Sequence, residues 1–129
     1  MISSEGGAWL FLTGAVAAAG LHLVLILGAP IGYMTMGGRN PGVLPASARI
    51  ASAFQGVLVL VLALIVMQAA GVISVGFVPW AKWLIWVIVA IGASSLVANT
   101  ITPSKPERWF GIPVALALLL GSLTVALSV

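Results

Sequence analysis

A single histidine stands inside a long apolar run of this chain. Residues 17–30 read AAAGLHLVLILGAP, in which His22 is the only ionisable residue, and the chain has no other histidine. An imidazole can exchange a proton, hydrogen-bond through either ring nitrogen, or ligate a metal or haem iron. An ionisable side chain within a membrane-spanning segment marks a functional site by default. His22 is therefore the first candidate for chemistry.

Further polar residues lie in the other apolar runs at the spacing of one helix face. Ser52 and Gln55 are three residues apart, and Ser95 and Asn99 are four apart. Because consecutive spans run in opposite directions, these side chains and His22 fall at similar depth in one half of a membrane. They form a predicted polar cluster: His22, Ser52, Gln55, Ser95 and Asn99.

Two interpretations of this polar cluster remain open. In the first, a neutral His22 bonds to Gln55 or Ser95 and holds the helices in register, as interhelical hydrogen bonds do. In the second, the cluster is a site for a proton relay, a polar substrate or a cofactor. Small residues on the His22 face, such as Ala18 and Ala19, favour close approach of a second helix, so His22 is expected to face the bundle interior.

Three arginines, Arg39, Arg49 and Arg108, are the candidate contacts for an anion or for lipid headgroups. Arginines at the cytoplasmic ends of spans set topology and meet anionic headgroups. A pair such as Arg49 and Arg108 could instead grip an anionic ligand.

Other kinds of chemistry lack the required residues. One histidine, no cysteine and no carboxylate within the apolar runs fall short of the three or four ligands of a metal site. Catalytic sets of serine, histidine and acid, carboxylate pairs and phosphate loops are also missing from the sequence. We therefore predict no enzymatic activity, no catalytic residue, no metal and no bound cofactor. The few basic residues form no patch, so nucleic acid is not an expected partner.

Composition and run length assign the elements that must position these residues. The chain of 129 residues is 62% hydrophobic and 5% charged, which indicates lipid as its main solvent. Spanning helices need roughly 20 mostly apolar residues. Four segments meet this requirement and predict an all-α, transmembrane four-helix bundle in one domain, residues 1–129, with helices at about 8–29, 48–70, 80–98 and 109–129.

The loops predict the orientation of the bundle. The first and third loops, with the helix ends beside them, hold Arg39, Arg49, Lys105 and Arg108, whereas the opposite side holds only Lys82. The positive-inside rule then places these two loops in the cytoplasm and both termini on the outer side. The first span lacks a preceding Lys or Arg, so we expect it to be retained rather than cleaved as a signal peptide.

Two loop-centred stretches carry a resemblance. Residues 28–52 read GAPIGYMTMGGRNPGVLPASARIAS, and residues 99–118 read NTITPSKPERWFGIPVALAL. Together they resemble a group of small four-helix bacterial integral membrane proteins with no assigned activity. The resemblance implies four spans in a bacterial inner membrane and assigns no site residues.

Three functional hypotheses follow. The first is a non-enzymatic accessory or self-associating bundle, acting as a homo-oligomer or within a larger membrane complex in the lipid bilayer. The second is a small homo-oligomeric transporter or channel with a polar pocket around His22 on the cytoplasmic half. The third is haem or another cofactor held through His22 in a dimer, which supplies two histidines where one chain has one.

Overall fold

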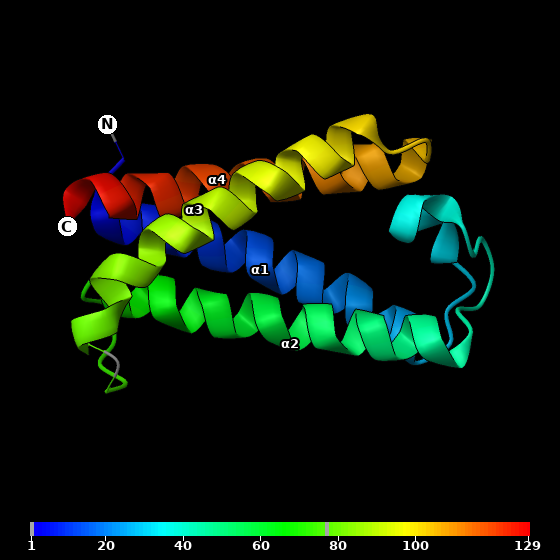
Figure 1. The fold of residues 1–129 in the computed structure, drawn as a ribbon, viewed down its shortest axis with the longest axis horizontal. Helices are drawn as coiled ribbons and strands as arrows, with labels where there is room; N and C mark the ends of the chain where they lie inside the picture. Colours follow the sequence, from blue (N-terminus) through cyan, green and yellow to red (C-terminus); the bar gives the residue numbers. More distant parts are fainter. Residues whose placement is uncertain (1, 77) are drawn as a thin grey trace.

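Within residues 2–76 and 78–129, the part of the chain that the computed structural model describes, four long helices pack into a bundle (Figure 1). Two short 3-10 turns, η1 (Gly32–Met34) and η2 (Met36–Gly38), lie between the first two helices. The all-α prediction is confirmed, and all four helices are long and apolar enough to cross a membrane. The helices are α1 (Ser4–Ile26), α2 (Ala46–Ala69), α3 (Val78–Ile101) and α4 (Lys105–Ser128).

The starts of α1 and α4 lie four residues before the predicted positions 8 and 109 because serine caps define them. The Ser3 hydroxyl accepts from the Gly6 amide at 3.0 Å, and the Ser104 hydroxyl accepts from the Glu107 amide at 3.4 Å. Such caps satisfy amides that have no partner in the first helical turn. Pro106 falls in the first turn of α4, where proline fits the helix.

The ends of α1 and α3 also differ from prediction. α1 stops at Ile26 rather than at 29, and Gly28 follows with a φ of 101°, a backbone conformation that glycine adopts without steric cost. α3 continues to Ile101 rather than ending at 98. It stops there because Pro103 disfavours a helical conformation of the residue before it, Thr102.

The helices run in opposite directions and pack in the spatial order α2, α1, α4, α3. α1 contacts α2 on one side and α4 on the other, and α4 contacts α3. The fourth pair, α2 and α3, makes far fewer contacts, although these helices are consecutive in the chain. In Figure 1 they cross near the left end of the bundle and diverge toward the right.

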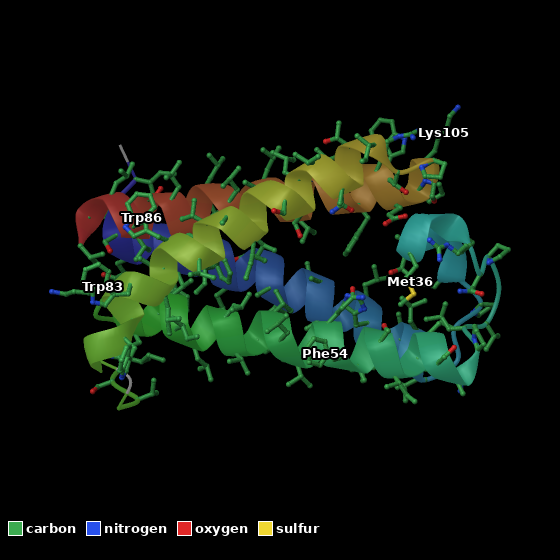
Figure 2. All side chains as sticks on the ribbon, in the orientation of Figure 1. Met36, Phe54, Trp83, Trp86 and Lys105 are labelled. Carbon is green, nitrogen blue, oxygen red and sulfur yellow. The ribbon has the colours of Figure 1, made fainter. Side chains whose placement is uncertain are left out.

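The two ends of the bundle differ. At the terminal end, where α1 begins and α4 ends, side chains such as Phe11, Val66, Ile85 and Val125 are fully buried in the main apolar core. Many large apolar side chains remain exposed, such as Phe54 of α2, which is labelled in Figure 2. A soluble monomer rarely exposes so large an apolar surface, and a lipid bilayer would cover it.

At the other end, here called the loop end, residues 27–45 fold over the bundle (Figure 1). The Gly32 amide donates to the Gly42 carbonyl at 2.9 Å, and a side chain at position 32 would collide with the Asn40 carbonyl. A small second core of Leu25, Leu44 and Ala48 anchors this loop, and Met36 packs against it (Figure 2). The loop is therefore a folded cover and not a loose connection.

Candidate functional site

His22 is hydrogen-bonded to a neighbouring helix. Its Nδ1 lies 2.6 Å from the hydroxyl oxygen of Ser52 on α2, and Ser52 is completely buried. Gly56, one turn further along α2, lets α1 approach, because a Cβ there would lie 3.2 Å from the Cβ of His22. The bond expected to Gln55 or Ser95 is therefore made to Ser52, a different member of the predicted cluster.

A cavity of about 230 Å³ lies beside His22, lined by residues of all four helices and of the first loop. This volume lies just below the range of about 300–1,000 Å³ found for ligand pockets, so it suits a small or slender molecule. Four members of the predicted cluster line the cavity, and Ser52 lies behind His22. The lining members are His22, Gln55, Ser95 and Asn99.

The α3 wall of the cavity is held by Asn99 and a glycine. The Asn99 side-chain amide donates to the Ser95 carbonyl at 2.7 Å. Gly111 of α4 faces Asn99 so closely that a Cβ at position 111 would overlap the amide oxygen. Gly111 thus makes room for the Asn99 amide between α3 and α4, next to the cavity that both residues line.

The cavity has an apolar floor. Phe11, Leu62, Ile88 and Leu118 line it toward the middle of the bundle, and Phe11 and Ile88 are almost completely buried. The main apolar core follows beyond them toward the terminal end. The cavity is therefore polar near the loop end and closed by apolar side chains at mid-bundle.

One side of the cavity opens between α2 and α3. Gln55 and Leu58 of α2 and Ile91 of α3 line the cavity, and all three side chains are exposed. This position coincides with the divergence of the two helices in Figure 1. The opening faces sideways, into the apolar belt that a membrane would surround.

The first loop covers the cavity at the loop end and is bonded to the start of α4. Met34 and Thr35 line the cavity, and the neighbouring Tyr33 carbonyl accepts a hydrogen bond from the Ser104 hydroxyl. The Gly37 amide donates to the Glu107 carboxylate at 2.9 Å. Loop residues 33–37 are thus held over the cavity by two hydrogen bonds to the start of α4.

Sequence reasoning missed Met34, Thr35 and Glu107 as parts of the site. The spacing of Ser104 and Glu107 matches a helix-capping pattern, which could have located the start of α4. The Glu107 carboxylate also accepts from the Thr102 hydroxyl at 2.8 Å, so it joins both loops of this end. No local pattern indicates a hydrogen bond between residues 37 and 107, which are distant in sequence.

The three candidate arginines lie at the loop end, outside the cavity lining. The Arg49 Nε donates to the Leu44 carbonyl at 3.0 Å, and the Arg108 guanidinium donates to the Thr102 carbonyl. Arg39 is exposed. Arg49 and Arg108 thus stabilise the loops beside them with part of their donor capacity.

Comparison with known proteins adds no identity. No family model matches the chain, and neither the curated proteins nor the solved structures include a significant match. The functional argument therefore depends on the geometry of the cavity.

Proposed function

We propose that this protein is a non-enzymatic integral membrane protein that binds a small molecule in the cavity around His22. The observation that carries the proposal is the cavity itself, lined by four helices, polar at one end and apolar at the other. Ligand pockets combine mostly apolar walls with a few polar groups that fix orientation. The proposed setting is a bacterial inner membrane, with the first and third loops in the cytoplasm.

A binding role has better support than an open channel. The path from the cavity toward the terminal end is filled by Phe11, Ile88 and Leu118 and then by the main apolar core. A continuous pore needs polar groups or water along its whole length. A transporter that uses the cavity as its substrate site is our second candidate, and the sparse contacts between α2 and α3 support it, because they leave these two helices room to separate.

Self-association has little support from the faces of the helices that carry glycine, although such faces can bring two helices close together. Gly7, Gly14, Gly56 and Gly121 all pack against neighbouring helices of the same chain, where a Cβ would meet other atoms within 3.3 Å. These glycines serve the internal packing of the bundle. A second copy or a partner subunit would have to bind other surfaces.

Filling the cavity tests the proposal. Ala18 of α1 lines the cavity, whereas the adjacent Ala17 is exposed on the lipid-facing side. Ala18→Leu adds three carbons inside the cavity, and Ala17→Leu adds the same three carbons outside it. Native mass spectrometry of protein extracted gently from its membranes should find a small-molecule adduct on the wild type and on Ala17→Leu, and a loss of most of that adduct from Ala18→Leu.

Each other outcome has a clear meaning. An adduct that persists in Ala18→Leu would show binding at the outer surface, and a wild type with no adduct would contradict the binding proposal. An adduct with the mass of haem would favour cofactor binding through His22. A copurifying polypeptide in place of a small molecule would favour the accessory role.

A further inference from the structure

The chemistry of the cavity lining defines the class of molecule that fits it. Resting on the proposed binding function, we infer that the cavity selects a neutral amphiphile from the membrane, with an uncharged hydrogen-bonding head group and a slender apolar body. Three features carry this inference: the uncharged polar end, the apolar floor and the sideways opening.

The polar end of the cavity holds hydrogen-bonding side chains, but none in the described part of the chain has a full charge that could pair with a charged ligand. His22, Gln55, Asn99, Thr35 and Ser95 supply donors and acceptors, and among the described residues the lining includes no Asp, Glu, Lys or Arg. A charged head group buried among such residues would lack a counter-ion, which is costly in a low-dielectric site. An alcohol, ester, amide or ketone would find partners there.

Two charged residues of the loop end, Glu107 and Arg49, are engaged in the cover of the cavity. Glu107 accepts hydrogen bonds from the Gly37 amide and the Thr102 hydroxyl, and Arg49 donates to the Leu44 carbonyl. Neither Glu107 nor Arg49 is part of the lining. These two charged side chains therefore stabilise the loops and do not belong to the lining of the cavity.

The length of the cavity suits a short chain or a small ring system. Phe11 at the floor and His22 at the polar end are separated along α1 by roughly 16 Å at 1.5 Å per residue. The walls between them are apolar, with Leu62 and Leu118 from the helices opposite. A molecule with its head at His22 would bury its apolar body against these side chains.

The opening indicates where such a molecule comes from. Leu58 and Ile91 flank the gap between α2 and α3 and are partly exposed, so an apolar body could pass between them. From the aqueous side, Met34 and Thr35 lie across the cavity, held by the bonds of Tyr33 and Gly37 to Ser104 and Glu107. The cavity is therefore accessible from the hydrocarbon layer through the gap between α2 and α3, whereas the first loop covers it on the aqueous side.

Three photoreactive probes test this inference on the full chain in lipid nanodiscs. The probes share one decyl chain with a diazirine and differ in the head group: an alcohol, a sulfate or a trimethylammonium. The alcohol should label cavity peptides of α1 and α3, and the two permanently charged probes should label them at least about ten-fold less, since charges are costly within a membrane. Gln55→Leu, at the exposed edge of the cavity, should reduce alcohol labelling several-fold without a change in thermal unfolding.

The Ala18→Leu and Ala17→Leu pair separates failure of the inference from failure of the proposed function. Equal labelling by all three probes, or preference for a charged probe, overturns the inference of a neutral head group. If Ala18→Leu then abolishes that labelling, the cavity still binds a small molecule and the proposed function holds. Labelling that is the same in Ala18→Leu as in the wild type, or absent from the cavity peptides, overturns both.

Discussion

At the scale of single residues, the pairing of His22 and Ser52 explains how an imidazole can lie inside an apolar bundle. A buried polar group is costly without a partner, and the buried Ser52 hydroxyl supplies one at 2.6 Å. The bond occupies Nδ1 and fixes the plane of the ring. It thereby orients the His22 side chain, which also lines the cavity.

Removing this hydroxyl should destabilise the bundle modestly. Ser52→Ala leaves the His22 ring nitrogen without its partner, and we expect the free energy of unfolding to fall by about 0.6–2 kcal/mol, the range for interhelical bonds in membranes. Thermal unfolding in one detergent would measure it. Ser94→Ala is the matched control, because the exposed Ser94 hydroxyl donates to the Ala90 carbonyl of its own helix and to no other helix among the described residues. Equal effects of the two substitutions would contradict an interhelical role for Ser52.

At the scale of elements, glycines determine how closely the helices approach. The contact of α1 with α4 brings backbone against backbone at Gly121, where a Cβ would lie 2.6 Å from the Gly7 carbonyl oxygen and 2.7 Å from the Phe11 nitrogen. Neither atom can move without displacing its whole helix. The same contact places Phe11, which forms part of the cavity floor, against α4.

Enlarging this glycine should separate α1 from α4. We expect Gly121→Ala to lower the free energy of unfolding by about 1–3 kcal/mol, the usual cost of overpacking. Gly20→Ala is the control, because an added Cβ at the exposed Gly20 meets nothing within 4 Å. Alanine there should stabilise α1 by about 0.5–1 kcal/mol, since it restricts the unfolded chain. A Gly121→Ala protein as stable as the wild type would show that the helices can separate without cost.

At the scale of the whole molecule, the fold collects most of the positive charge at one end. Arg39, Arg49, Lys105 and Arg108 belong to the loop end, where the first and third loops meet, and Lys82 lies near the start of α3 at the terminal end. Figure 2 shows Lys105 at the loop end and Trp83 and Trp86 toward the other end. This asymmetry supports the predicted orientation with the loop end in the cytoplasm.

Cysteine labelling would test the orientation directly, since the chain has no cysteine of its own. Ser47→Cys at the loop end and Ser74→Cys at the terminal end are both exposed and conservative. In intact bacterial cells a membrane-impermeant maleimide should label position 74, and it should label position 47 only after lysis. The reverse pattern would overturn the predicted orientation, and labelling of neither position in lysed cells would argue against exposure of these two positions.

The number of helices, their approximate bounds and the residues of the polar cluster could be predicted from the sequence because they depend on local rules. Run length and hydropathy locate spans, and three- or four-residue spacing locates faces such as that of Ser95 and Asn99. Antiparallel connection of consecutive spans then puts these residues and His22 in the same half of the bundle.

Only the tertiary structure decided which of these residues meet and what lies between them. Ser52 is the partner of His22 because Gly56 lets α1 and α2 approach, and the cavity exists because α2 and α3 diverge. The cover depends on the bond between Gly37 and Glu107, which are 70 residues apart in sequence. Such contacts follow from the packing of helices around one another, and local sequence patterns carry no information about them.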